Sequence, residues 1–165
     1  MNRINNSFKS EKGSIIVLAV FMLILATGVF SYVVDLGRIQ LARHKLYVAA
    51  DMASLAGATQ LDKDEARGRE PKAVIMEDQA INLAEEYINR NQFDKGTEGW
   101  LGIKESQDNK ISMSDYTIEN AQGPNGLVAM ITIETQATIY PLVFKGVFQK
   151  STPKARSKSV VYLTY

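Results

Sequence analysis

The sequence has no cysteine, and its 165 residues include one histidine and one tryptophan. Without cysteine there is neither a disulfide framework nor a thiolate zinc site, so the fold does not depend on the redox state of its compartment. His44 stands between Arg43 and Lys45, with no carboxylate or nucleophile at a matching spacing. We interpret it as a helix-surface residue. Because phosphate loops, nucleophile elbows and metal-ligand clusters are also missing from the sequence, it predicts a non-enzymatic protein without a cofactor.

An excess of charge of one sign is missing as well. Lys and Arg number 19 against 18 Asp and Glu, which leaves a net charge of +1. This balance gives no support to nucleic-acid binding, which needs a basic surface, so no nucleic-acid partner is expected.

What the chain does contain is one apolar stretch without any charge, from Ser14 to Val34. A helix of this length spans about 30 Å, the thickness of the hydrocarbon core of a bilayer. A cleaved signal peptide is the competing interpretation, because basic residues precede the stretch. A signal peptide has an apolar region of about 7–15 residues and an A-x-A site, and no clear site of that kind follows here. We therefore expect a retained transmembrane helix.

This stretch divides the chain into three parts. We expect a cytoplasmic leader at residues 1–13, a transmembrane helix at residues 14–34, and an extracytoplasmic α+β domain with a helical stalk at residues 35–165. Lys and Arg are nearly equal in number on the two sides of the span, so the positive-inside rule does not fix the orientation. A short leader needs no translocation, which favours a single-pass protein of the cytoplasmic (inner) membrane with its N-terminus inside.

A basic residue and a glycine, Lys12 and Gly13, stand directly before Ser14. A prepilin peptidase cuts at junctions of this kind, so Gly13 and Ser14 form a candidate processing junction. Type IV pilins usually carry a glutamate at the fifth position after the cut, whereas this chain has Leu18. The alternative is that Gly13 only marks the start of the helix.

Beyond the span, small and apolar residues recur at spacings of three and four, which predicts that the helix continues. The residues of this stripe are Ile39, Ala42, Leu46, Ala49, Ala53 and Ala56, and we expect Leu41, Val48, Met52 and Leu55 to widen it. Ala49 and Ala53 are candidate packing residues, because an alanine seam lets two helices approach closely. The polar face should carry Asp51 and Ser54; Asp51 either pairs with a basic residue of a neighbouring subunit or marks the solvent-exposed side.

Three features carry a resemblance to a known family: Gly13 before the apolar run, Asp35-Leu36-Gly37-Arg38 at its exit, and the run AADMASLAGA from Ala49 to Ala58. They resemble the N-terminal segment of the TadE/TadG-like proteins of Flp (tight-adherence) pilus assembly. The resemblance covers about residues 13–61. Asp35, Gly37 and Arg38 are the candidate membrane-exit residues.

The resemblance implies a pilin-like or pseudopilin-like envelope protein, in which a membrane helix carries a small α+β head. Its implied partners are the membrane, other Tad/Flp pilus or secretion components, and further copies of itself. Leu18 stands where pilins have a glutamate. In this respect the chain resembles the TadG branch, whose members are similar to pilins but show no clear cleavage of the leader.

The rest of the chain should form the head. We predict a charged loop at residues 62–71, whose acidic residues lack the spacing of a calcium-binding EF-hand. A second helix is expected from Lys72 to Asn91, with its apolar stripe at Ala73, Met76, Ala80, Leu83 and Tyr87. The loop at residues 93–110 contains Trp100, either as an exposed contact residue or as an anchor folded onto the core.

After residue 110 the apolar period changes to two, which predicts strands. They are expected at residues 111–119, 127–139 and 157–165, with a turn at residues 123–126. In the central strand Leu127, Ala129, Ile131, Ile133, Ala137 and Ile139 share one face. The fold class is therefore α+β, a small antiparallel sheet of about three strands with helices laid against it.

Between the last two expected strands, basic residues gather near aromatic ones. The candidate contact residues are Phe144, Phe148, Lys150, Lys154 and Lys158. Such a segment either holds a loop against anionic lipid headgroups or an acidic partner, or consists of a short core-filling helix followed by a solvated basic loop.

The leading hypothesis is a non-enzymatic, single-pass membrane protein of Flp/Tad-type pilus assembly or surface adhesion, which acts through helix packing and contacts of its head. The alternative is a membrane-tethered sensory or ligand-binding domain. That alternative requires a pocket in the head, whereas the leading hypothesis requires packing surfaces.

Overall fold

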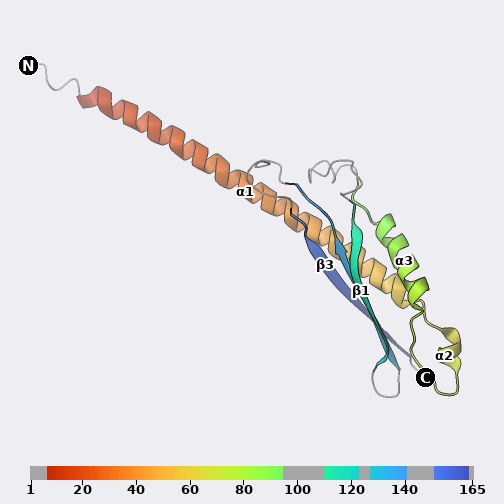
Figure 1. The fold of residues 1–165 in the computed structure, drawn as a ribbon. Helices are drawn as coiled ribbons and strands as arrows, with labels where there is room; N and C mark the ends of the chain where they lie inside the picture. The colour runs from red at the N-terminus through yellow and green to blue at the C-terminus, as the bar shows by residue number, and fades with distance from the viewer. Residues whose placement is uncertain (1–6, 95–109, 123–126, 141–150, 164–165) are drawn as a thin grey trace, which may run out of the picture. The chain divides into compact units, whose positions relative to one another are not determined.

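The computed structural model describes residues 7–94, 110–122, 127–140 and 151–163. The elements follow in the order α1 (Ser7–Ala58), α2 (Lys63–Arg67), α3 (Glu77–Arg90), β1 (Ser112–Gln122), β2 (Val128–Gln136) and β3 (Lys154–Tyr162), as Figure 1 shows. The predicted α+β class is confirmed. The chain divides into two compact units, Met1–Gly37 and Arg38–Tyr165, which are described in turn.

The first unit contains the apolar part of α1. The large apolar side chains from Ile15 to Val33 are all exposed, with Phe30 at 75 %. The hydroxyls of Thr27 and Ser31 donate to the carbonyls of Leu23 and Thr27 at 2.8 Å, so both are satisfied within the helix, as an apolar environment requires. Within the part of the chain that the structure describes, α1 is the one helix long and apolar enough to cross a membrane.

The second unit is built on a three-stranded antiparallel sheet in the order β1-β2-β3. In the central strand every second residue is buried: Ala129, Ile131, Ile133 and Thr135. This is the face that the alternating pattern predicts. Ile131 lies opposite Ile118 of β1 and opposite Ser159 of β3, so the inner face continues across all three strands.

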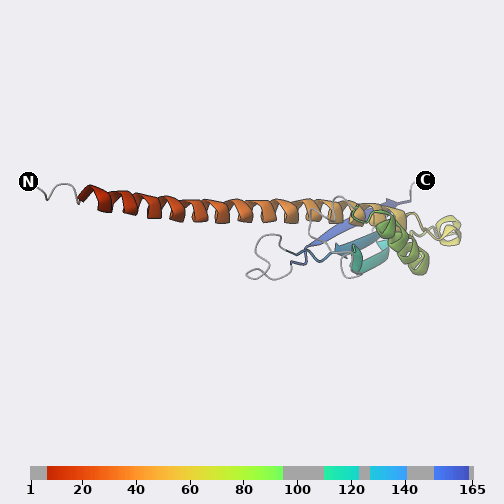
Figure 2. The same ribbon diagram turned by 90° about the horizontal axis from the view of Figure 1, so that it is seen from above.

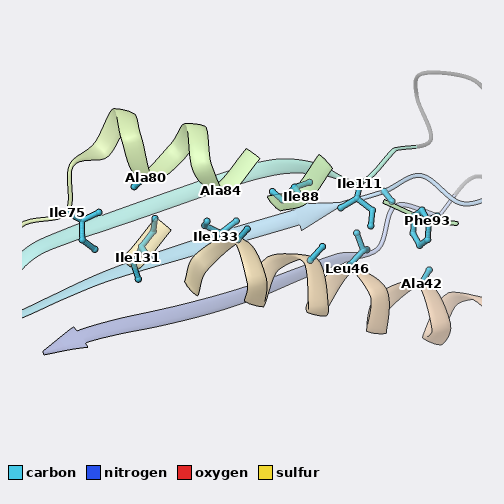
Figure 3. Close-up of a cluster of buried hydrophobic side chains, with 14 of the residues drawn as sticks. Ala42, Leu46, Ile75, Ala80, Ala84, Ile88, Phe93, Ile111, Ile131 and Ile133 are labelled. Atoms are coloured by element: carbon cyan, nitrogen blue, oxygen red, sulfur yellow. The ribbon is translucent and has the colours of Figure 1, made fainter. Parts of the chain in front are cut away.

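Both long helices pack on this inner face (Figure 3). The Thr135 hydroxyl donates to the Leu46 carbonyl of α1 at 2.9 Å, and the Tyr116 hydroxyl donates to Glu77 of α3 at 3.1 Å. The helical core residues are Ala42, Leu46, Ala49 and Ala53 of α1 and Ala80, Ala84 and Ile88 of α3. Alanines dominate the list because they let the helix axes approach the sheet closely. Figure 2 shows the same ribbon from above.

The buried face of α1 differs from the predicted one. Leu41, Met52 and Leu55, which we expected to widen the apolar stripe, are 38 %, 44 % and 59 % exposed. Ser54, which we placed on the polar face, is fully buried. Ser157 and Ser159 of β3 lie opposite Ser54 and bond its hydroxyl. The sheet therefore covers the side of the helix that carries Ser54. The spacing of apolar residues does not reveal this direction.

The second long helix begins later than predicted, at Glu77 rather than Lys72. Ile75 pairs instead with Leu61 in an isolated bridge, and the Asn120 side-chain amide bonds both backbone groups of Ile75, at 2.7 and 3.3 Å. These contacts keep residue 75 extended. The buried stripe of α3 consists of Ala80, Ala84 and Ile88, not of Leu83 and Tyr87, which are only half-buried.

The predicted charged loop contains one short helix, α2, whose N-terminus is capped by the Asp62 carboxylate through the backbone N–H groups of Asp64 and Glu65. The last strand starts at Lys154 rather than at Ser157. The expected turn at residues 123–126 and Trp100 lie outside the described residues. The ends of the segment that contains Trp100 are joined by the Gln92 side chain, which bonds the N–H and C=O of Ile111 at 2.7 and 2.8 Å.

Candidate functional site

The candidate site is the contact between residues 38–58 of α1 and the inner face of the sheet. At its centre Ser54 Oγ lies 2.9 Å from Ser159 Oγ of β3 and 3.0 Å from the carbonyl oxygen of Asp51. It is also 3.4 Å from Ser157 Oγ. A serine hydroxyl has one proton, so Ser54 can donate to only one of these neighbours. Donating to the Asp51 carbonyl and accepting from Ser159 satisfies both hydroxyls; Ser54 is fully buried and Ser159 is half-buried.

Asp51 lies at the edge of the same network. Ser157 Oγ donates to the Asp51 carboxylate at 3.0 Å, and Asp51 itself is exposed whereas Ser157 is buried. Its carboxylate therefore has a partner within its own chain, on the solvent-exposed border of the α1–β3 contact. Asp51 thus lies on the solvent-exposed side of the helix, which is the second of the two interpretations made from sequence, and its bond to Ser157 also helps to position the helix on the sheet.

Arg38 is at the start of the same segment. Its side chain is almost completely buried, with 1 % exposed, and its Nη2 donates to the carbonyl of Tyr140 at 3.4 Å. A guanidinium removed from water needs hydrogen-bond acceptors to offset its lost hydration. Tyr140 follows β2 in the chain, so this bond joins the beginning of the second unit to the segment that follows the central strand.

The alanine seam is occupied by the chain itself. Ala49 and Ala53 are completely buried in the core formed with the sheet. We expected from sequence that this seam could pack against like helices of other copies. In the structure the chain's own sheet covers these two side chains, so a second helix can reach them only if the head opens.

Gly57 belongs to the site and was not singled out from sequence. A Cβ at this position would lie 2.8 Å from Ile131 Cδ1 and 3.3 Å from the carbonyl oxygen of Ala80. Gly57 is thus a point where α1 comes close to both α3 and β2. At Gly13 and Gly37, in contrast, a Cβ would meet nothing within 4 Å.

The candidate processing and membrane-exit residues lie in the first unit, apart from Arg38. Gly13 and Ser14 lie inside α1 rather than at its start, and both are exposed. Asp35 is half-buried and Gly37 is exposed. The helix therefore begins before the junction, and Gly13 does not punctuate it.

The basic contact residues are only partly described. Phe144, Phe148 and Lys150 lie outside the described residues. Lys154 and Lys158 lie on β3 and point to the outer face of the sheet, where the Lys154 ammonium pairs with the Glu134 carboxylate at 2.8 Å. This pair, together with the Ser114 hydroxyl, holds the pKa of Glu134 below its usual value of 4.5. The strand, rather than a loop, positions both lysines because charged and small residues alternate from Lys154 to Ser159.

Three further observations bear on the chemistry of the described residues. Among the described residues no group of histidine and acidic side chains is arranged to hold a metal ion. One open hollow is lined by charged residues around α2: Asp64, Glu65, Gly68, Arg69, Glu70 and Lys72. The hollow is open, and apart from Gly68 its lining residues are charged and include no large apolar side chain to hold a small ligand, so it does not favour the sensory alternative. On the inner face, the hydrogen bond to Glu77 raises the pKa of Tyr116 above 10.0.

The comparisons with known proteins bear on the N-terminal part of the chain. No curated protein and no solved structure matches it. Residues 13–60 match the protein-family model described as "Putative Flp pilus-assembly TadE/G-like". They comprise most of α1 and the two residues after it. The match confirms the resemblance: this segment is similar to the TadE/G-like proteins of Flp pilus assembly.

Proposed function

We propose that the chain is a single-pass protein of the cytoplasmic membrane that acts in Flp/Tad pilus assembly or surface adhesion. The N-terminal leader lies in the cytoplasm, α1 crosses the membrane, and the α+β head lies outside. The observation that carries this proposal is the coincidence of the family match, residues 13–60, with a helix whose large apolar side chains are exposed from Ile15 to Val33.

The mechanism we propose is packing without catalysis. Residues 38–58 of α1 are committed to the chain's own sheet through the alanine seam, Arg38 and the serine network. Contacts with other pilus components are therefore made by the span and by the outer surfaces of the head. The exposed Leu41, Met52 and Leu55 belong to those surfaces.

The test is the intact mass of the protein purified from its native membrane, compared with its mass in a sheared surface fraction. Full-length protein found in the membrane alone supports a permanent anchor that acts in assembly. A species that lacks residues 1–13 and appears in the sheared fraction indicates prepilin-type processing and a filament subunit. Recovery of the full-length protein in the soluble fraction contradicts membrane anchoring.

The orientation is tested by single cysteines, because the natural chain has none. Thr59→Cys, just after α1, should react with a membrane-impermeant maleimide in cells whose outer membrane is permeabilised. Ser10→Cys in the leader should react only after the inner membrane is opened. The opposite pattern of labelling would place the head in the cytoplasm and overturn this part of the proposal.

A further inference from the structure

The outer face of the sheet, opposite the helices, has an unusual distribution of charge. Acidic residues project from β1 and basic residues from β3: Asp115 and Glu119 against Lys154, Arg156 and Lys158. Lys154 is engaged by Glu134 of β2. Neighbouring strands are about 4.8 Å apart, so the outer strands are about 10 Å apart, which is too far for a direct ion pair. Among the described residues Asp115, Glu119, Arg156 and Lys158 form no ion pair.

One end of this outer face is apolar. Val160 and Tyr162 of β3 are 38 % and 66 % exposed, and Val160 lies beside Met130 of β2. The two long helices, α1 and α3, pack on the inner face, so neither of them covers these side chains. An exposed apolar patch bordered by ordered charges is typical of a protein-binding surface.

We propose that the outer face binds the outer face of a second copy of this chain, with the two copies related by a two-fold axis that runs along β2. Such an axis places β1 of each copy over β3 of the other. Asp115 then faces Arg156 of the second copy, and Lys158 of the second copy lies between Asp115 and Glu119. The acidic residues of β1 in each copy thus pair with the basic residues of β3 in the other copy.

The alternative two-fold axis, perpendicular to the strands, gives the opposite result. It places β1 over β1 and β3 over β3, so that acidic residues face acidic ones and basic residues face basic ones. Glu134 lies on the axis that we propose and faces its own counterpart, but within each chain it is already paired with Lys154. The distribution of charge therefore selects the axis along the strands.

The arrangement also suits two chains anchored in one membrane, and in this respect it rests on the proposed function. In the second unit α1 runs antiparallel to β2, because Leu46 contacts Thr135 while Gly57 contacts Ile131. An axis along β2 keeps the Arg38 ends of both copies at the same end of the pair. The perpendicular axis would place them at opposite ends.

The size of the face predicts how strong the association is. Three strands of this length cover about 400 Å² per copy, about half of what a standard stable interface buries. We therefore expect the pair to be weak in dilute detergent and populated in a bilayer, where anchoring in one plane raises the effective concentration.

The experiment uses the purified full-length chain in liposomes, with cysteines introduced one at a time. Thr132→Cys lies at the centre of the outer face, on the axis, and should form a disulfide-linked dimer under mild oxidation. Glu85→Cys, on the exposed side of α3, is the matched control for random collisions in the bilayer and should give much less. Equal crosslinking at both positions, or crosslinking at Glu85 alone, would overturn the proposal.

Charge reversal supplies the sharper test, in the Thr132→Cys background. Asp115→Arg and Arg156→Asp should each lower the yield of dimer about tenfold, because the two-fold axis turns two attractive contacts into two repulsive ones. The double variant, with both charges exchanged, should recover most of the yield. Circular dichroism of each variant checks that the head is folded. If the single reversals have no effect, or if a folded double variant does not recover, the proposed axis is wrong.

These outcomes can be distinguished from a failure of the proposed function. The liposomes contain no other pilus component, so crosslinking at Thr132 does not depend on a role in pilus assembly. If the protein is not anchored in a membrane in cells, its recovery in the soluble fraction shows this independently of the crosslinking result.

Discussion

Ser54 of α1 and Ser159 of β3 are 105 residues apart in the sequence, and their hydroxyl oxygens lie 2.9 Å apart. Together with Asp51 and Ser157 they form the polar part of a contact whose other half consists of alanines. Hydrogen bonds fix the direction and register of a helix on a sheet more strictly than apolar contacts do, because they require defined distances and angles. We interpret this network as the feature that fixes how α1 lies on the strands.

The first prediction concerns this network. Ser54→Ala should lower the free energy of unfolding of the head by about 1–2 kcal/mol, because the half-buried Ser159 loses the hydrogen bond to its partner. The measurement is denaturant unfolding of the full chain in detergent micelles. Ser159→Ala and the double variant complete a cycle, and a coupling energy close to zero would show that the two hydroxyls do not interact.

The second prediction concerns the alanine seam. Ala49→Leu should destabilise the head by about 1–3 kcal/mol, because its completely buried site has no room for a larger side chain. Met52→Leu, which introduces the same residue on the exposed side of the same helix, should have little effect on unfolding. Normal unfolding of Ala49→Leu combined with loss of pilus assembly would show instead that the seam packs between subunits.

The third prediction concerns pH. Lys154 and Ser114 bond the ionised form of Glu134, so the pKa of Glu134 is lower in the folded chain than its usual 4.5. The unfolded chain then binds the proton more tightly, and the stability due to this pair is present above pH 4.5 and is lost as the pH falls through the lower, folded pKa. Unfolding midpoints measured across this range should decrease less for Glu134→Gln than for the natural chain. Identical decreases would show that the pair does not affect stability.

The features that the sequence predicts correctly are those whose signal is local. The apolar run from residue 14 to residue 34 and the alternation along β2 each repeat over a few residues, so they predict the long helix and the buried face of the central strand. The resemblance to TadE/TadG-like proteins also depends on one continuous segment, and the family match over residues 13–60 confirms it.

The features that the sequence predicts wrongly are those that depend on residues distant in the chain. The burial of Ser54 is decided by the serines of β3, and the late start of α3 is decided by the contacts of Ile75 with Leu61 and Asn120. Asn120 is 45 residues from Ile75 in the chain. No period within either segment contains this information, so the pattern of apolar residues placed both features wrongly.

The last prediction concerns Gly57, where α1 comes close to both α3 and β2. A methyl group at Gly57 would lie 2.8 Å from Ile131 Cδ1, which is shorter than any comfortable contact between two carbon atoms. Alanine has a higher helix propensity than glycine by about 1 kcal/mol, so a site with free space would gain stability from Gly57→Ala. We expect a net loss of about 1–2 kcal/mol instead, because the buried Ile131 has to move within a packed core.

Two comparisons make this prediction specific. Gly37→Ala changes the same residue type in the same helix at a position where a Cβ meets nothing within 4 Å, so it should leave stability unchanged or raise it. Ile131→Val removes Cδ1, the atom that the new methyl group would strike, and costs about 1 kcal/mol alone because it leaves a small cavity. Combined with Gly57→Ala, the added methyl group occupies that cavity, so the double variant should be more stable than the sum of the two single losses predicts. Additive losses in thermal unfolding would mean that Gly57 is constrained by the carbonyl of Ala80 rather than by Ile131.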